Sequence, residues 1–417
     1  MTAATTEPLI RPPRLHTGRP GDASRLELFF DLAFVVVVLE LAAAFVHDLS
    51  WHGLGVFVGL FVAVWVSWVG FTLYANRFDT DDVIFRVGKL LATLSVAGCA
   101  ASASDATGTY AVAFAGSFLA GRLLLFLLYL RAWRHVADAR PTIAVYLVCI
   151  GVSSTLWAVS LAMPGTLRYV CWGLAVLVDA LGPLLATLRT DKLPLHIEHL
   201  PERFGLFVIL VLGEAVGGTA RGVHDSEWAA GSVLTALAGF AVAAGMWWIY
   251  FDVAAGASAR RLEEADDEAA EEAADGTADG GPPTGEEGSD PPGAEADERH
   301  DLFVYGHLPM CLGIVAAGIG LEVLVLHPTE PAPASATWVI CGGLALFLTG
   351  VVLVIGGTAR TWASVWPWPI PGVPVLLALA LIPYPAAWTL VVVAAAFMIA
   401  AAVLGTLRSR RTSELSA

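Results

Sequence analysis

The chain has 417 residues, of which 57% are hydrophobic and 15% charged, and its mean hydropathy is +0.69. This composition excludes an ordinary soluble domain, and repeated apolar runs, each able to cross about 30 Å of hydrocarbon as a helix, predict an all-α polytopic membrane protein. Much of the net charge of −15 lies in residues 260–300, which hold fifteen acidic residues and three arginines. Such a segment opposes binding to nucleic acid or anionic lipid.

In chain order, residues 1–24 are polar and predict a disordered cytoplasmic tail without a cleavable signal peptide. Helices one to eight occupy residues 25–251, and an acidic disordered loop covers residues 252–300 because it lacks apolar periodicity. Helices nine to twelve occupy residues 301–407, and residues 408–417 form a second cytoplasmic tail. The predicted spans are 27–47, 53–74, 83–104, 109–130, 142–163, 168–187, 203–222, 231–251, 302–326, 337–357, 370–382 and 386–407. The eleventh is the shortest, and it follows a stretch dense in Trp and Pro.

The distribution of positive charge gives the orientation. With twelve spans and an inner N-terminus, 19 of the 23 Lys and Arg residues fall in inner segments, whereas only Arg168 and Arg221 fall in outer loops. Inner loops of membrane proteins carry this excess. The sequence therefore predicts a protein of the cell inner (plasma) membrane with both termini in the cytoplasm.

A weak internal repeat divides the chain. Offsets of 174 and 176 residues match the first and seventh helices and the second and eighth, and the offset rises to 218 beyond the acidic loop. The growth equals roughly the length of that loop. The matched pairs include Phe30 with Phe204, Glu40 with Glu214, Tyr74 with Tyr250, Phe85 with Phe303 and Lys89 with His307. This pattern predicts two six-helix repeats, about 25–188 and 200–407, in the same orientation, with a site between them near mid-membrane.

Three carboxylates fall near the middle of predicted spans: Glu40, Asp179 and Glu214. An ionised carboxylate there is costly unless it meets a partner or a water-filled cavity. Desolvation and neighbouring like charge favour the protonated form, so these residues are candidates for proton or ion coupling. The alternative is that each is permanently protonated and hydrogen-bonded to a neighbouring helix.

A second group of charges lies in the inner half of the predicted bundle: Asp31, Lys89 and Arg122. A structural salt bridge among them is one reading, and a switchable ion pair at an inner gate is the other. Glu27 lies on the same helical face as Asp31 and is expected to act as an interfacial helix cap. His307 is expected to be a satisfied helix residue.

The stretch "LHIEHLPERFG" places His196, His199 and Glu202 at helical spacing. A metal site is conceivable there, but a juxtamembrane helix start is favoured because Pro201 interrupts the set and a fourth ligand is lacking. No cofactor is predicted. In "NRFDTDD", Asp79, Asp81 and Asp82 are expected to form a solvated turn in which Thr80 or Asp81 caps the third helix, or a gating contact with other inner loops.

Three motifs carry a resemblance over nearly the whole chain: "RLELFFDLAFV", "ANRFDTDD" and "HLPERFGLFVILVLGEAV". Together they resemble the bacterial low temperature requirement A (LtrA) family of multipass membrane proteins, which implies a link to growth in the cold. The family commonly has Ser where this chain has Ala215. The matching motif residues are Glu27, Phe29, Phe30, Asp31, Asn76, Arg77, Asp79, Asp82, His199, Glu202, Arg203, Gly213 and Glu214. Separately, R-x-x-x-F-F-D in the first helix resembles the R-x-x-x-F-S-D of lysosomal and bacterial potassium channels.

These features predict a proton- or cation-coupled secondary transporter rather than an enzyme, with Glu40 and Glu214 binding the coupling ion and a small ion or molecule as substrate. A cation channel is the closest alternative. A membrane-embedded metal enzyme, resting on the histidine group alone, and a regulatory scaffold whose acidic loop recruits a cytoplasmic partner are alternatives of other classes. The expected environment is the lipid bilayer, and a homo-oligomer stays open.

Overall fold

The computed structural model describes residues 9–15, 24–79, 81–189, 200–255, 294–358 and 368–416. The described part is helical apart from two short strands, β1 (Arg14–Leu15) and β2 (Phe78–Asp79). The helices are α1 (Arg25–His47), α2 (Trp51–Arg77), α3 (Val83–Ser102), α4 (Ala111–His135), α5 (Arg140–Ser160), α6 (Gly165–Arg189), α7 (Leu200–Asp225), α8 (Ala230–Trp248), α10 (Ala294–Leu326), α11 (Ala334–Thr358), α12 (Pro369–Leu379) and α13 (Ala387–Ser416). A 3-10 turn, η1 (Ala103–Asp105), follows α3, and a π-helical segment, η2 (Ile249–Ala255), follows α8.

Eleven of the described helices are long and apolar enough to cross a membrane. The exception is α12, whose 11 residues span about 16 Å as an α-helix, roughly half of the hydrocarbon thickness. Proline at both position 369 and position 374 accompanies its short length. The multi-pass helical class is thus confirmed, and the predicted eleventh span is a shorter apolar helix.

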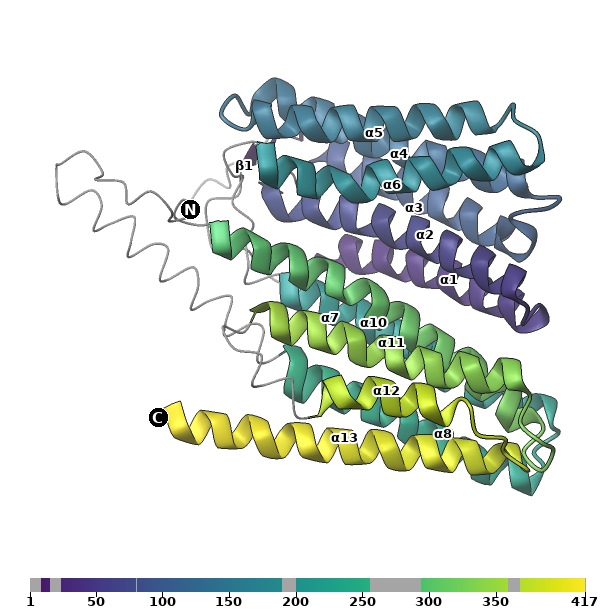
Figure 1. Ribbon diagram of the computed structural model, residues 1–417. Coiled ribbons are helices and arrows are strands. Elements are labelled where there is room, and N and C mark those ends of the chain that lie inside the picture. Colours follow the sequence, from purple (N-terminus) through teal and green to yellow (C-terminus); the bar gives the residue numbers. More distant parts are fainter. Residues whose placement is uncertain are drawn as a thin grey trace, which may run out of the picture. The chain divides into compact units, whose positions relative to one another are not determined.

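The chain divides into two compact units, residues 1–203 and residues 204–417. The boundary falls inside the first turn of α7. In the first unit, α1 packs on α2 and α3, and the chain then folds back on itself so that α3, α4, α5 and α6 are successive neighbours (Figure 1). Large aromatic side chains fill this unit, and the largest fully buried ones include Trp65, Trp68, Tyr74, Trp157 and Tyr129.

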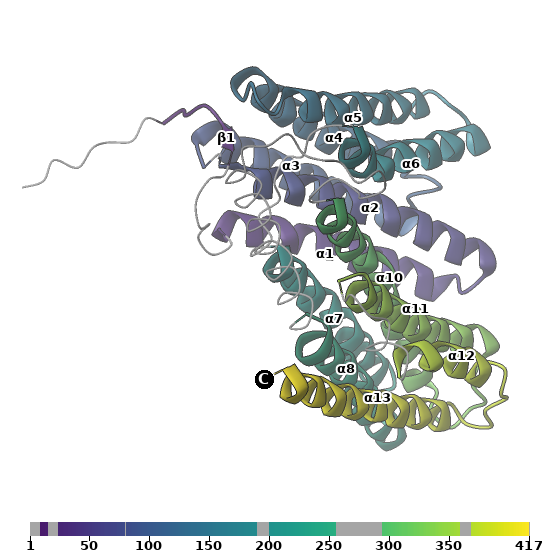
Figure 2. The ribbon, with the colours of Figure 1, turned by 60° about the vertical axis from the view of Figure 1, so that its left-hand side comes forward.

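In the second unit, α10 and α11 form the closest helix pair, α12 lies against α11, and α13 runs beside α8 (Figures 1 and 2). Glycines permit the α10–α11 approach. A Cβ atom at Gly350 would lie 2.6 Å from the Cβ of Met310, and one at Gly343 would lie 2.7 Å from the backbone nitrogen of Ala317. Real Cβ atoms do not come so close, so larger residues at these positions would force the helices apart.

Local signals fix several helix starts. Ser24 and Glu27 form a reciprocal capping box at the start of α1, which agrees with the cap expected of Glu27. At α3 the capping residue is Asp82, whose carboxylate accepts from the Phe85 amide at 3.0 Å. The expectation that Thr80 or Asp81 caps this helix is wrong, because the helix begins at Val83 and Asp82 is the residue directly before it.

The predicted disordered tail contains an ordered part. Residues Arg14 and Leu15 pair antiparallel with Asp79 and Phe78 of β2, and the amide of Val83 donates to the carbonyl of Leu9 at 3.2 Å. Short backbone pairing and charged side chains therefore attach residues 9–15 to the start of α3. The acidic loop predicted over residues 252–300 lies largely outside the described residues, so the prediction that it recruits a partner stays a prediction.

Candidate functional site

At the start of the first unit, two carboxylates of α1 bind one guanidinium. Arg203 approaches Glu27 at 2.6 Å and Asp31 at 3.2 Å. Asp31 is fully buried, and the indole nitrogen of Trp68 donates to it at 2.8 Å. A charged donor and a neutral donor together offset the desolvation cost of burying this carboxylate. The partner of Asp31 is therefore Arg203, and neither Lys89 nor Arg122 pairs with it in the described structure.

Lys89 of α3 is fully buried, yet its ammonium makes no hydrogen bond within the described residues. It lies instead over aromatic rings, 3.8 Å from the ring centroid of Phe30 and 5.2 Å from that of Phe71. The negative ring faces attract a cation. The salt bridge expected between Lys89 and Asp31 is not formed in the described structure.

Arg122 of α4 has a different partner from the one expected. Its Nη2 atom lies 2.5 Å from the carboxylate of Asp179 on α6, and Ser153 of α5 donates to the second oxygen of that carboxylate at 2.6 Å. Both charged side chains are about 3% exposed. The Nε and Nη1 atoms of Arg122 have no hydrogen-bond partner among the described residues. Asp179, a candidate for proton or ion coupling in the sequence, is thus held by an ion pair and a hydrogen bond that join three helices.

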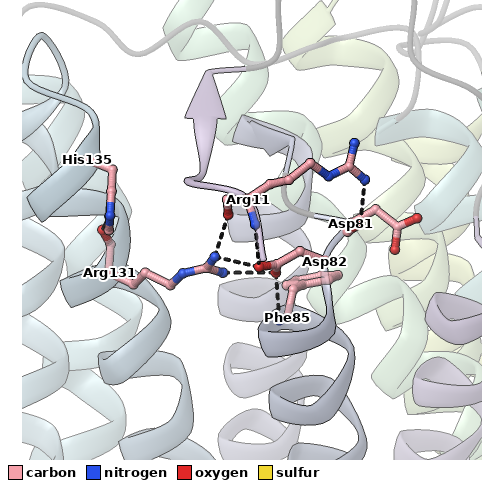
Figure 3. A network of polar contacts seen from close by, with 6 residues as sticks. All are labelled: Arg11, Asp81, Asp82, Phe85, Arg131 and His135. Atoms are coloured by element: carbon pink, nitrogen blue, oxygen red, sulfur yellow. Dashed lines mark hydrogen bonds and ion pairs between the residues drawn. The ribbon is translucent and has the colours of Figure 1, made fainter. Parts of the chain in front are cut away.

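The "NRFDTDD" motif organises the segment that precedes α1. Asp82 accepts two bonds from Arg131 of α4, at 3.0 and 2.6 Å, and one from the backbone amide of Arg11 at 3.2 Å (Figure 3). Arg131 also donates to the carbonyl of Arg11 at 2.5 Å, and the Arg11 guanidinium donates to the carbonyl of Asp81 at 2.8 Å. We call this set of contacts the N-terminal latch, meaning Arg11, Asp81, Asp82 and Arg131.

The carboxylates of the latch have lowered pKa values for identifiable reasons. Burial acts to raise the pKa of Asp82, but the hydrogen bonds from Arg131, Phe85 and Arg11 outweigh it and lower the pKa overall. The pKa of Asp81 is lowered chiefly by its hydrogen bonds with Arg86. Both groups are therefore anionic at neutral pH, and the contacts of the Asp82 carboxylate in Figure 3 agree with this charge.

Three further motif residues lie at the end of α2 and in β2. Arg77 ends α2 with its guanidinium buried, and it donates to the hydroxyl of Tyr146 at 2.6 Å. Asp79 joins β2 through its backbone. Asn76 is half-buried beside them. The motif thus combines a buried cation, a strand and the capping residue of α3.

In the second unit, two carboxylates also share one arginine. Arg221 lies 2.5 Å from Glu214, two turns earlier on α7, and 2.7 Å from Glu322 on α10. Glu214 is fully buried, and its Oε2 atom has no hydrogen-bond partner in the described part of the chain. Gly218 allows the two helices to approach, since a Cβ there would lie 2.6 Å from the carbonyl oxygen of Gly318. Glu322 is an ion-pair partner of Arg221, and its side chain is only 13% exposed.

His307 of α10 is buried and hydrogen-bonded at both nitrogens, to the hydroxyl of Tyr250 at 3.0 Å and to the carbonyl of Phe303 at 2.7 Å. Its ring lies 4.7 Å from that of Phe204 and 4.6 Å from that of Phe303. His307 is therefore the satisfied helix residue that the sequence predicts. The offsets that match the two halves align His307, Phe204 and Phe303 with Lys89, Phe30 and Phe85.

The remaining predicted residues are less informative. Glu40 and Phe29 are exposed on α1, and Glu202 is exposed in the first turn of α7. His196 and His199 lie outside the described residues, and no group of metal-binding side chains occurs in the part that the structure describes. Gly213 has open space where a Cβ would lie, so the glycine there is not explained by close packing.

For two arginines that define these clusters, the sequence predicts no partner. The distribution of positive charge assigns Arg221 to an outer loop, although its spacing of seven residues from Glu214 would put both on one helical face if α7 continued. The sequence identifies Arg203 only as a motif residue. Its partners on α1 are more than 170 residues earlier, and local spacing carries no signal for such a contact.

Comparison with known proteins gives one family. Residues 22–275 and 288–407 match the family described as bacterial low temperature requirement A protein (LtrA). The chain is also 28% identical over 342 residues to the uncharacterised protein RA0937 of Rhizobium meliloti (strain 1021), covering 79% of this chain and 76% of that protein. No solved structure matches. With its multi-pass helical structure and a match over most of its length, the chain belongs to the bacterial LtrA family of integral membrane proteins.

Proposed function

We propose that the protein is a secondary transporter coupled to protons or monovalent cations, with Glu214 as the coupling carboxylate. The observation that carries the proposal is the Oε2 atom of this buried side chain, which has no hydrogen-bond partner among the described residues. A buried carboxylate oxygen without a donor is costly, and binding of a proton or a cation to that oxygen removes the cost. Buried ionisable residues in membrane helices commonly mark ion pathways for this reason.

The formal charge of the Glu214–Arg221–Glu322 cluster sets how many protons or monovalent cations it binds. Glu214 and Glu322 carry two negative charges and share the single positive charge of Arg221. The cluster therefore has a formal charge of −1, which one proton or one monovalent cation neutralises. When Glu214 takes that charge, Arg221 keeps its second partner, Glu322, so the guanidinium is not left unpaired.

Glu40 is the second coupling candidate, because it is the residue aligned with Glu214 in the first half. Two six-helix repeats in one orientation, with the termini in the cytoplasm, form part of the proposal. The repeated arrangement of a basic residue between matched phenylalanines, at Lys89 and at His307, supports the repeat. The charge distribution of the loops supports the orientation.

Flux measurements on purified protein in liposomes test the proposal. An imposed proton gradient, with K⁺ or Na⁺ as the counter-flowing cation, should drive flux in the wild type and should not in Glu214→Gln. Glu330→Gln is the matched control, since Glu330 is exposed outside the spans, and it should transport normally. Normal coupled flux in Glu214→Gln would refute the role of Glu214. Flux that is uncoupled and far faster than a carrier cycle would replace the transporter by a cation channel.

The family description also links these proteins to low temperature. Under the transport proposal, a strain lacking the gene should grow poorly in the cold. Wild-type protein should restore growth, whereas Glu214→Gln at equal abundance should not. Equal restoration by both proteins would separate cold growth from ion coupling.

A further inference from the structure

The first unit contains a buried cation, the Lys89 ammonium, that has no hydrogen-bond acceptor among the described residues. The Lys89 ammonium is surrounded by ring faces, at 3.8 Å from the centroid of Phe30, 5.2 Å from Phe71 and 6.0 Å from Phe85. We call these three rings the phenylalanine cage. No oxygen of the described chain accepts from the amine, so the contacts that hold it are those that an untethered ammonium would make with aromatic rings.

The charges beside the cage explain why it contains a cation. Glu27 and Asp31 bind one guanidinium, that of Arg203, which leaves a formal charge of −1. Arg203, Glu27 and Asp31 all act electrostatically on Lys89, and a positive charge on the lysine amine brings the formal charge of the group to zero. The Glu214–Arg221–Glu322 cluster has the same formal charge of −1 and contains no lysine. In the first unit, a side chain of the protein therefore supplies the positive charge.

The aligned position in the second unit has the rings without the cation. His307 lies between Phe204 and Phe303, and a hydrogen bond satisfies each of its nitrogens. A pair of phenylalanines at these positions can therefore surround a side chain that is not a cation. In the first unit a cation is needed because the two carboxylates of α1 share a single guanidinium.

We propose that the phenylalanine cage is a binding site for a small alkylammonium cation, and that Lys89 is its tethered occupant. A primary amine on a short alkyl chain reproduces the shape and charge of the lysine side chain. Such a ligand enters when the Lys89 side chain is removed or withdraws. Lys89 is then a competitor for the site, built into α3.

Chemical complementation tests this site. Lys89→Ala leaves a cavity next to an uncompensated negative charge, and millimolar n-propylammonium should raise its melting temperature by several degrees while leaving wild type unchanged. The neutral isostere n-propanol should have little effect on the variant. His307→Ala is the matched control and should not respond to n-propylammonium. Equal stabilisation by the alcohol and the amine, or no stabilisation by the amine, would overturn the proposal.

A second measurement keeps Lys89 in place and covers the case in which Lys89→Ala fails to fold. Fluorinated phenylalanine at position 30 preserves ring shape but weakens the negative ring face. The melting temperature should fall stepwise with the number of fluorines at Phe30 and stay level for the same series at Phe204. An equal fall in melting temperature at the two positions would show that the ring faces of the cage do not stabilise a cation. Neither experiment involves Glu214, so its outcome is separate from that of the flux measurements.

Discussion

Removing one member of the Arg122–Asp179 pair should destabilise the first unit more than any loss of a neutral hydrogen bond. Asp179→Leu leaves the Arg122 guanidinium buried with no hydrogen-bond partner among the described residues and removes the acceptor of Ser153. Breaking a buried ion pair in this way costs about 3–5 kcal/mol. Neutral hydrogen bonds between membrane helices contribute about 0.6 kcal/mol on average. A loss above about 2 kcal/mol therefore identifies an uncompensated charge.

The double variant Arg122→Leu/Asp179→Leu supplies the decisive comparison. Replacing both charges by apolar residues of similar size is often nearly neutral, and two donors of Arg122 lack a partner to begin with. The double variant should therefore be more stable than Asp179→Leu alone, with a coupling energy of at least about 2 kcal/mol.

The assay is equilibrium unfolding of the purified protein in mixed micelles at increasing mole fraction of SDS, followed by tryptophan fluorescence. Asp81→Leu serves as the control because its pair with Arg86 is about 60% exposed on both sides, and it should change the free energy of unfolding by less than about 1 kcal/mol. If Asp179→Leu resembles Asp81→Leu, or if the double variant loses the sum of the two single losses, the reasoning about a buried charge is wrong.

Three further predictions concern the latch, the helix packing and acid pH. Asp82→Asn should weaken the N-terminal latch, so that hydrogen exchange at residues 9–15 becomes faster while exchange in α5 stays unchanged; equal rates in wild type and variant would contradict the contacts of Figure 3. The folded-state pKa of Asp82 is lowered, so its contribution to the stability of the latch is present above the ordinary aspartate pKa of about 3.9 and is lost as pH falls through the folded pKa. Protection of residues 9–15 against exchange should therefore decline below about pH 4. A decline only above neutral pH would contradict this sign. Gly343→Ala should destabilise the α10–α11 pair by about 1–3 kcal/mol, whereas Gly342→Ala, next to it but with open space around its Cβ, should be neutral or slightly stabilising; equal effects in thermal unfolding would argue against close packing at Gly343.

Much of the architecture could be predicted from sequence, because membrane insertion depends on local properties. A run of about 20 apolar residues reports a helix by length and composition alone, and all eleven long spans lie where such runs occur. The sequence also shows that the eleventh predicted span is weak, since Pro369, Pro371 and Pro374 lie in the first six residues of a short apolar helix. The same local logic identified Glu27 as a helix cap and His307 as a satisfied residue.

Side-chain partners were decided by the tertiary structure. Sequence grouped Asp31, Lys89 and Arg122 by depth, but depth along a helix does not give the direction in which a side chain points. In the folded chain Asp31 binds Arg203, and Arg122 binds Asp179. These pairs join residues 172 and 57 positions apart, so only helix packing brings them together.

A many-helix membrane protein of a recognisable family therefore follows from the sequence alone, because hydrophobicity and motif order are properties of the linear chain. Which buried charges are neutralised by a partner was decided by the tertiary structure. Within the described residues, the tertiary structure leaves the Oε2 atom of Glu214 without a donor and surrounds the Lys89 ammonium with aromatic rings. Both follow from the rotation and packing of helices, which fix the few atoms that can reach a buried charge.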